Sequence, residues 1–277
     1  MRAEVMTLGT PNPRQREFLA CERKYVAFGG ARGGGKSWAV RCKAKLLALR
    51  YAGIRILLVR RSLAELEANH LAFLRQELAD VAEYRAGERQ FRFCNGSVLQ
   101  FGYCGCDRDL DRYQGAEYDV IFLDEATQLK EQWMRQIAAC VRGVNDFPKR
   151  IYYTCNPGGP GHGYIKRLFI DRRFEDGEQP EDYAFIPARV TDNTALLARQ
   201  PDYLKTLEAL PYKLRRAWLE GRWDVFAGQV FQEFTDDPDH YDDRRWTHVI
   251  RPFDVPREWN IYRSYDFGYA RPFSCGW

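Results

Sequence analysis

The sequence predicts an α/β fold in which a mostly parallel sheet is flanked by helices. Short apolar runs rich in β-branched and aromatic residues alternate with longer stretches of helical period, which is the pattern of strands joined by helical crossovers. A glycine-rich turn separates the first strand from the first helix, and the later strands end in polar residues. That end of the strands is where open α/β sheets bind ligands. With 277 residues, 45% of them hydrophobic, the chain can bury one sizeable core and part of a second.

The first half of the chain contains two strand and helix pairs. In chain order they are a strand at 24–28, a helix at 35–51, a strand at 54–59 and a helix over 62–81. The last helix is predicted from leucines that we interpret as one helical face: Leu63, Leu66, Leu71, Leu74 and Leu78.

A hairpin follows at residues 89–103, where two alternating strands surround Asn95-Gly96. This dipeptide favours a tight turn because both of its positions accept a positive φ, and we interpret the hairpin as an antiparallel insertion. Beyond it the sequence predicts a buried strand at 118–126, a helix at 131–143 and a strand at 150–161 that breaks at Asn156-Pro157.

The composition changes after about residue 175, where a polar, loop-like stretch precedes a helical segment with a proline break. We therefore expect four parts. They are an α/β core at 1–178, a small helical subdomain packed on the sheet at 179–226, a linker rich in Asp, Pro and Arg at 227–258, and the first strands of another unit at 259–277.

Composition excludes several classes of protein. The chain has no apolar run of roughly eighteen residues and no signal-peptide pattern at its start, so we expect a soluble intracellular protein without a membrane partner. The eight cysteines are scattered, and Cys104 and Cys106 have no neighbouring histidines to form a zinc site, so we expect reduced thiols. The formal net charge of +4 permits a local nucleic-acid contact without requiring one.

The glycine-rich turn fits the phosphate-loop pattern G-x-x-x-x-G-K-[ST] and lies, as that pattern requires, between a strand and a helix. Glycines let backbone N–H groups turn inward around an anion, and the helix amino end adds partial positive charge. A plain flexible turn is the alternative, but it has no use for Lys-Ser at this offset. The predicted nucleotide-binding residues of the loop are Gly30, Ala31, Arg32, Gly33, Gly34, Gly35, Lys36 and Ser37.

The strand at 118–126 supplies the second half of the predicted site. Asp124 ends this strand and, with the Ser37 hydroxyl, is expected to bind Mg²⁺. Glu125 is expected to orient and deprotonate a water for attack on the γ phosphate of ATP. Strands often end in acids, so the pair indicates hydrolysis mainly in combination with the loop and Lys36.

Further candidates surround these groups. Arg32 is expected to neutralise charge on the γ phosphate, with a surface arginine as the alternative. Gln15, with Phe18 close by, is placed to recognise adenine, with a solvated glutamine as the alternative. Asn156 is placed to sense the γ phosphate, with a plain turn residue before proline as the alternative. Arg112 is a candidate finger offered to a neighbouring subunit, a role for which Arg108 and Arg142 compete.

Five segments, taken in order, resemble the large terminase subunit of tailed bacteriophages. The resemblance extends from Gln15 to Phe231 and rests on GGARGGGKS, NGSVLQFG, RYQGAEYDVIFLDEA, TCNPGG and LRRAWLEGRWDVFAGQVF. It implies a P-loop NTPase fold of the RecA-like, catalytic-glutamate type, and identifies the helical stretch at 179–226 as a lid subdomain.

The resemblance also implies a function. It predicts an ATP- and Mg²⁺-dependent motor that forms a homo-oligomeric ring at the portal of an empty capsid and drives double-stranded DNA inward, with portal protein and small terminase subunit as partners. Arg32 and Glu125 would be catalytic, and the coupling segment would be Thr154, Cys155 and Asn156; the family often has glycine where Cys155 stands. The protein would act in the cytoplasm of the infected bacterial host, would not be retained in the mature virion, and would be a monomer in isolation.

The end of the chain resembles the first strand of the RNase H-like nuclease domain of terminases, with Asp266 as its first metal-binding acid. That fold needs further strands and acids, so we expect no DNA cleavage by this chain and interpret it as part of a longer protein. Two other functions stay open at this point. A nucleic-acid helicase would need a second RecA-like domain, and a non-catalytic ATP-binding switch would leave Glu125 idle.

Overall fold

The structure is a computed structural model that describes residues 9–225, 237–243, 245, 247–260, 262, 264–266 and 274–276. The chain divides into two compact units, Met1–Gly228 and Gln229–Trp277, which are described separately.

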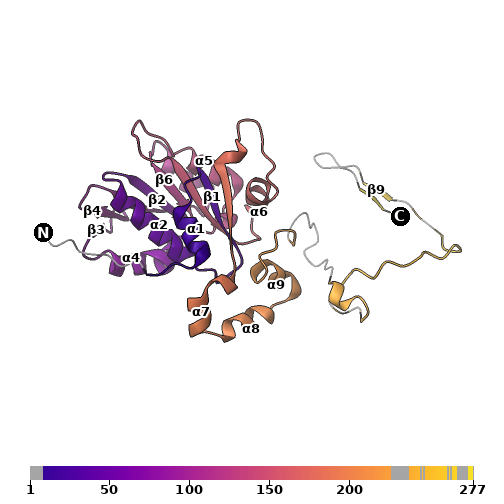
Figure 1. The fold of residues 1–277 in the computed structure, drawn as a ribbon. Coiled ribbons are helices and arrows are strands. Elements are labelled where there is room, and N and C mark those ends of the chain that lie inside the picture. The colour runs from indigo at the N-terminus through magenta and orange to yellow at the C-terminus, as the bar shows by residue number, and fades with distance from the viewer. Residues whose placement is uncertain are drawn as a thin grey trace. The chain divides into compact units, whose positions relative to one another are not determined.

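An eight-stranded sheet forms the centre of the first unit (Figure 1). The strand order is β3-β4-β5-β2-β6-β7-β1-β8; the six strands from β5 to β8 are mutually parallel, whereas β3 and β4 run antiparallel at one edge. The strands are β1 (Tyr25–Gly30), β2 (Arg55–Arg60), β3 (Ala82–Arg85), β4 (Gln90–Phe93), β5 (Val98–Tyr103), β6 (Val120–Leu123), β7 (Arg150–Cys155) and β8 (Tyr183–Ala188).

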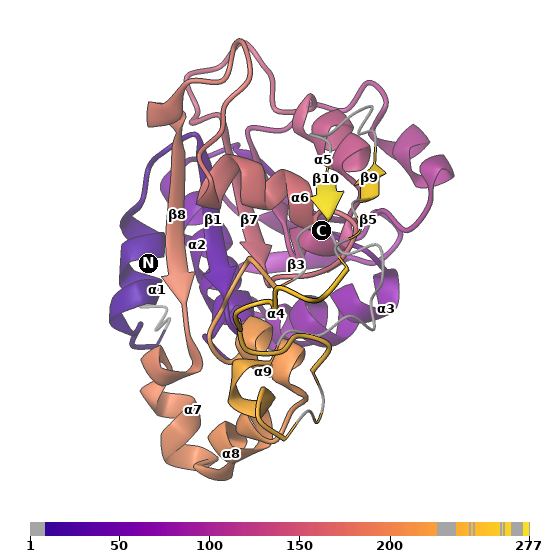
Figure 2. The ribbon, with the colours of Figure 1, turned by 90° about the vertical axis from the view of Figure 1, so that its right-hand side faces the viewer.

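Helices cover both faces of this sheet, which explains why the central strands contain continuous apolar runs rather than alternating apolar and polar residues. One face packs against α1 (Pro13–Ala20), α2 (Lys36–Arg50), α3 (Leu63–Leu66) and α4 (Ala72–Glu77). The other packs against α5 (Glu131–Ala138) and α6 (His162–Ile165), as the turned view also shows (Figure 2). Neighbouring residues of one strand join different cores: Phe28 packs on the first face and Ala27 on the second.

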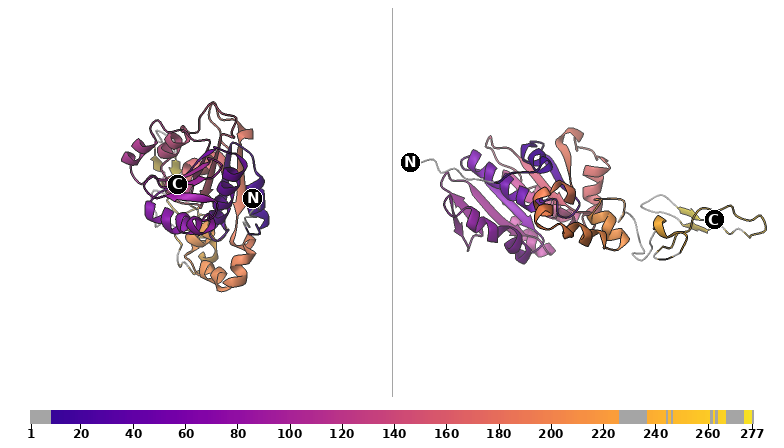
Figure 3. Two further views of the ribbon diagram at one scale, coloured as in Figure 1. Left: turned by 90° about the vertical axis from the view of Figure 1, so that its left-hand side faces the viewer. Right: turned by 60° about the horizontal axis from the view of Figure 1, so that its bottom comes forward.

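Three short helices follow β8: α7 (Thr194–Arg199), α8 (Asp202–Glu208) and α9 (Tyr212–Trp218). They lie beyond the end of the sheet to which the strand arrows point, rather than over either face (Figure 3). This is the edge at which the phosphate loop connects β1 to α2. Their predicted role as a lid remains a proposal.

The structure departs from the sequence predictions in three places. β8 pairs with β1 in the sheet, although its residues fall after position 178, where helical structure was expected to begin. The antiparallel pairing predicted at 89–103 is confirmed for β4 and β5, but β5 also pairs in parallel with β2, so the hairpin continues the main sheet and is not a separate insertion. The helix predicted over 62–81 is interrupted by a π-helical turn at Glu67–Leu71 and ends before the unpredicted strand β3.

Within the second unit, the described backbone includes a 3-10 turn at Pro238–His240 and an antiparallel pair, β9 (Ser264–Asp266) with β10 (Ser274–Gly276). A strand pair was expected in this stretch; its assignment to a nuclease domain stays a prediction, and the side chain of Asp266 lies outside the described residues. Among the described helices, none combines the length and apolar character needed to cross a membrane.

Candidate nucleotide-binding site

The phosphate loop joins β1 to α2 and is shaped by glycines. Gly30, Gly33 and Gly35 have φ values of 124°, 77° and 74°, a region that disfavours residues with a Cβ atom. A Cβ on Gly35 would also lie 2.3 Å from Nε2 of Gln15. Lys36 begins α2 directly after Gly35, so the loop ends at a helix amino end, where backbone N–H groups favour an anion.

Lys36 connects the loop to the end of β7. Its buried Nζ donates hydrogen bonds to the Ala31 carbonyl at 2.6 Å and to Oδ1 of Asn156 at 2.7 Å. Burial lowers the pKa of Lys36, and nearby acidic groups, Glu125 and Asp124 among them, oppose that shift. The structure thus brings Lys36, Glu125 and Asn156 together at one pocket, while their roles there stay a prediction.

Asp124 is buried at the end of β6 and holds three partners. Its Oδ2 accepts a hydrogen bond from Nε2 of His70 at 2.8 Å and lies 3.4 Å from Nε of Arg60, while its Oδ1 accepts from Oγ1 of Thr154 at 2.5 Å. Burial alone would raise the pKa of Asp124, but His70, Arg60 and Thr154 outweigh it and hold this pKa well below its usual range. Asp124 is therefore ionised in the folded protein.

Glu125 follows Asp124 in an unusual backbone conformation, with φ of 51° and ψ of 49°. A left-handed backbone conformation is uncommon for residues other than glycine. A hydrogen bond from the Glu125 N–H to Oγ1 of Thr154, at 2.8 Å, stabilises it here. The carboxylate turns toward Arg60, whose Nη2 lies 2.8 Å from Oε1, and the Glu125 side chain is 40% exposed. It is thus partly open to the pocket, while Asp124 is not.

A pocket of about 510 Å³ is lined by the phosphate loop together with Glu125 and Asn156. Some of its lining was predicted from the sequence: Arg32, Gly33, Gly34, Gly35, Lys36, Ser37, Glu125 and Asn156. The rest was not: Trp38, Arg41, Asn69, Phe73 and Tyr203. Asn69, Phe73 and Tyr203 come from the π-helical turn, α4 and α8. These segments are distant from the loop in sequence, and only folding brings them next to it.

Contacts from distant segments hold the loop. Asn193 donates from Nδ2 to the Gly33 carbonyl at 2.7 Å, and the Arg32 N–H donates to the Trp218 carbonyl at 2.7 Å. The Arg32 guanidinium carbon lies 3.3 Å from the centre of the Trp218 ring, a cation–π contact that joins the loop to α9.

Gln15 contacts the loop through its amide. Nε2 donates to the Gly35 carbonyl at 3.0 Å and Oε1 accepts from the Asn12 N–H at 2.9 Å, so both polar ends of the side chain are engaged. Phe18, expected near the nucleotide, is instead fully buried and stacks on Phe28 with ring centres 4.9 Å apart. It is a core residue because it lies on the face of α1 that packs against the sheet.

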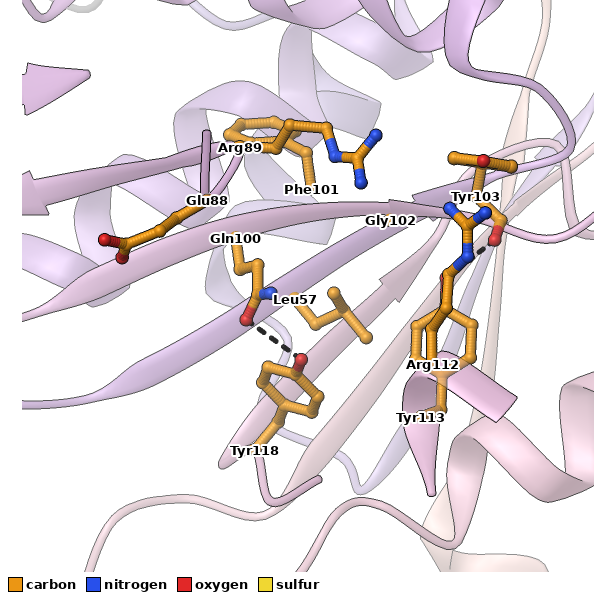
Figure 4. A pocket seen from close by; sticks show the side chains of 10 residues that line it. All are labelled: Leu57, Glu88, Arg89, Gln100, Phe101, Gly102, Tyr103, Arg112, Tyr113 and Tyr118. Atoms are coloured by element: carbon orange, nitrogen blue, oxygen red, sulfur yellow. Dashed lines mark hydrogen bonds between the residues drawn. The ribbon is translucent and has the colours of Figure 1, made fainter. Parts of the chain in front are cut away.

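Arg112 lies in a different pocket, of about 150 Å³, beside β5. Its guanidinium carbon is 4.2 Å from the centre of the Tyr103 ring, and its Nη2 is 3.4 Å from Oδ1 of Asp109. Figure 4 shows Arg112 and Arg89 directed toward Tyr103 from two sides. Arg112 does not line the phosphate-loop pocket of its own chain, and neither do Arg108 and Arg142.

The oxygen groups near the loop suit Mg²⁺ better than a transition metal. Mg²⁺ prefers oxygen ligands and commonly binds through one or two carboxylates together with substrate phosphates. Asp124 offers an ionised carboxylate, and the Ser37 hydroxyl lines the pocket. Within the described part of the chain, no group of three or more His, Cys, Asp or Glu residues could hold a metal ion by itself.

The sheet order and the phosphate loop between β1 and α2 define the P-loop NTPase fold. The chain belongs to the terminase large subunit family, because residues 27–235 match the family described as terminase large subunit, T4likevirus-type, N-terminal. A comparison with curated protein sequences found no significant match.

Solved structures show the same fold. The large terminase of a thermophilic bacteriophage, in complex with ADP, is 17% identical with a TM-score of 0.63, and the match covers 96% of this chain and 64% of that one. The same terminase in complex with ATP-gamma-S is 16% identical with a TM-score of 0.61, covering 96% and 63%. The large terminase ATPase domain of Thermus phage P74-26 is 14% identical with a TM-score of 0.55, covering 77% and 94%. This chain thus spans just under two thirds of the longer terminase.

Proposed function

We propose that this chain is the ATP-hydrolysing part of a viral DNA-packaging motor that moves double-stranded DNA into an empty capsid. The observation that carries the proposal is that Lys36 and Glu125 line one pocket at the phosphate loop, with Asp124 buried next to Glu125 and near enough for its charge to act on Lys36. Membership of the terminase large subunit family supports DNA as the substrate that is moved.

Each side chain has a role that follows from its position. Lys36, at the amino end of α2, would neutralise the β and γ phosphates. Glu125 is partly exposed to the pocket and would orient a water and accept its proton. Bound Mg²⁺ would supply charge neutralisation at the phosphate oxygens, with Asp124 and the Ser37 hydroxyl as the protein groups that hold it.

The test compares ATP hydrolysis and nucleotide binding in two variants. Lys36→Ala should lose nucleotide binding, whereas Glu125→Gln should retain it and lose hydrolysis by about 10²-fold or more, the usual contribution of a positioned general base. Glu131→Gln, which alters an exposed carboxylate on α5, serves as the control. If Glu125→Gln retained hydrolysis, Glu125 would not be the general base, and a non-catalytic ATP-binding switch would be favoured.

We further propose that hydrolysis is slow in the isolated chain because an arginine from a neighbouring copy is missing. Arg112 supports this, since it lies outside the phosphate-loop pocket of its own chain and its side chain is 45% exposed. Arg112→Ala should therefore leave single-chain turnover unchanged and reduce turnover of an assembled ring. Equal turnover in assembled wild-type and variant rings would reject Arg112 and direct attention to Arg108 and Arg142.

The remaining partners follow from the packaging role. A ring would contact the portal protein and the small terminase subunit in the bacterial cytoplasm and dissociate from the mature virion. Because basic residues would grip the DNA backbone, DNA affinity should fall steeply as salt rises. A salt-independent affinity would contradict translocation of DNA by this chain.

A further inference from the structure

His70 is fully buried, lies outside every motif of the sequence analysis, and contacts the acidic residue at the end of β6. We propose that His70 is a positioning residue for Mg²⁺ binding: its imidazole fixes the orientation in which Asp124 presents its carboxylate to the metal. The inference rests on the proposed function of the site and assigns a new residue to it.

The helix that carries His70 is built to turn it inward. The buried leucines Leu66 and Leu71 are five residues apart, a step that does not match the 3.6-residue period of an α-helix. Residues 67–71 form a π-helical turn, which closes with i→i+5 hydrogen bonds and accommodates this step. With the extra residue, the segment buries His70 beside Leu71 and returns to the core at Leu74. Single π turns inside helices are rare and occur often at functional sites.

The contact fixes both oxygens of the Asp124 carboxylate. Nε2 of His70 donates to Oδ2, because an ionised carboxylate can only accept, and Oγ1 of Thr154 donates to Oδ1. One donor on each oxygen prevents the group from rotating and leaves lone pairs free for the metal or its water ligands. Without His70, the charge of Arg60, 3.4 Å from Oδ2, would draw the carboxylate toward the guanidinium that also binds Glu125.

Packing alone does not account for a histidine at this position. Its other ring nitrogen, Nδ1, is buried and has no hydrogen-bond partner among the residues that the structure describes. A buried polar atom without a partner costs free energy, and an apolar side chain of similar size would avoid that cost. The hydrogen bond to Asp124 is therefore the feature of His70 that an apolar residue could not provide.

The test is the Mg²⁺ dependence of nucleotide binding, measured at equilibrium with a fluorescent ADP and without turnover. His70→Leu should raise the Mg²⁺ concentration for half-maximal binding by about 10- to 100-fold, the usual effect of losing a hydrogen-bonding partner of a metal ligand. His70→Gln places an amide N–H near the position of Nε2 and should restore most of the Mg²⁺ affinity. His70→Asn, whose amide is too short to reach, should not.

Leu71→Ala is the matched control, because it removes packing from the same turn without touching Asp124. It should lower the melting temperature and leave the Mg²⁺ dependence unchanged. An equal Mg²⁺ shift in Leu71→Ala, or Asn and Gln variants that behave alike, would overturn the positioning role. If His70→Leu does not fold, the contrast between Gln and Asn decides the question.

Failure of this inference is distinct from failure of the proposed function. A wild-type chain that binds no Mg²⁺-nucleotide would contradict the proposed function itself. A wild-type chain that binds and hydrolyses Mg²⁺-ATP, with no change in His70→Leu, would contradict the role of His70 alone.

Discussion

Arg60 and Glu125 form a salt bridge in which Nη2 lies 2.8 Å from Oε1, and the same guanidinium places Nε 3.4 Å from Oδ2 of Asp124. Arg60 ends β2, which lies next to β6 in the sheet, and its side chain is almost completely buried. One arginine thus forms ion pairs with both acidic groups at the proposed site and binds Glu125 at the shorter distance. Because it is held by the sheet rather than by a loop, its position is well defined.

We expect Arg60→Met to lower kcat by about 10- to 100-fold with little change in KM for ATP, since small misplacements of a catalytic group cost rate rather than binding. Arg60→Lys should recover part of the loss, because an ammonium group keeps the positive charge but cannot contact Asp124 and Glu125 through two separate nitrogens. Steady-state kinetics and the melting temperature of each variant check this. A raised kcat in Arg60→Met would show the opposite, that the salt bridge restrains Glu125 until it is released.

The Gln15 amide provides a second prediction, because it contacts both Asn12 and Gly35. If Gln15 braces the loop, Gln15→Ala should weaken ATP and GTP binding by the same factor. If Gln15 instead recognises adenine, Gln15→Ala should lose its preference for ATP over GTP. We expect the first result, together with a stability loss of about 1 kcal/mol from the disrupted start of α1. Binding of both nucleotides and chemical denaturation measure the two effects.

Part of this site follows from the sequence, and part depends on the fold. The loop and the Asp124–Glu125 pair were predicted because each is a short local pattern with a required chemistry. Arg60 and His70 were not predicted. Arg60 lies near Asp124 because β2 and β6 are neighbours in the sheet. His70 lies there because of a π turn, which the sequence indicates only by the five-residue spacing of two leucines.

The missed strands have physical reasons as well. β8 contains Pro187, which argues against a central strand, but β8 lies at the edge of the sheet, where a missing N–H is tolerated. β3 lies at the other edge, is short, and none of its residues is fully buried, so it has no apolar pattern to detect. Edge strands are the elements whose sequence is least constrained by the core.

The stacking of Arg32 on Trp218 provides a third prediction. Trp218→Ala should lower kcat by about 2- to 30-fold, the range that corresponds to losing a cation–π contact of 0.5 to 2 kcal/mol. ADP affinity should change little, because Arg32 is proposed to act on the γ phosphate. Trp218→Phe keeps an aromatic face and should stay close to wild type.

A double-mutant cycle separates this effect from loss of packing in α9. If the ring acts through Arg32, adding Trp218→Ala to Arg32→Ala should cause no further loss of kcat. Additive losses would show that Trp218 acts elsewhere, for example on the orientation of α9.

Lys43 provides a prediction about pH and stability. This buried side chain on α2 donates from Nζ to the carbonyls of Leu19, at 2.6 Å, and Cys21, at 3.2 Å. Burial lowers the pKa of Lys43 to about 8, below its value of about 10.4 in an unfolded chain. Between these values the unfolded chain binds more protons, so the free energy of unfolding should rise with pH across that window; below it Lys43 adds no pH dependence, because the cost of burying its ammonium is then fully present. Lys43→Met removes the titrating group, and the difference in unfolding free energy between wild type and variant should shift in favour of wild type from pH 8 to pH 10. A difference that stays constant over this range would show that Lys43 titrates in the folded protein as it does in water.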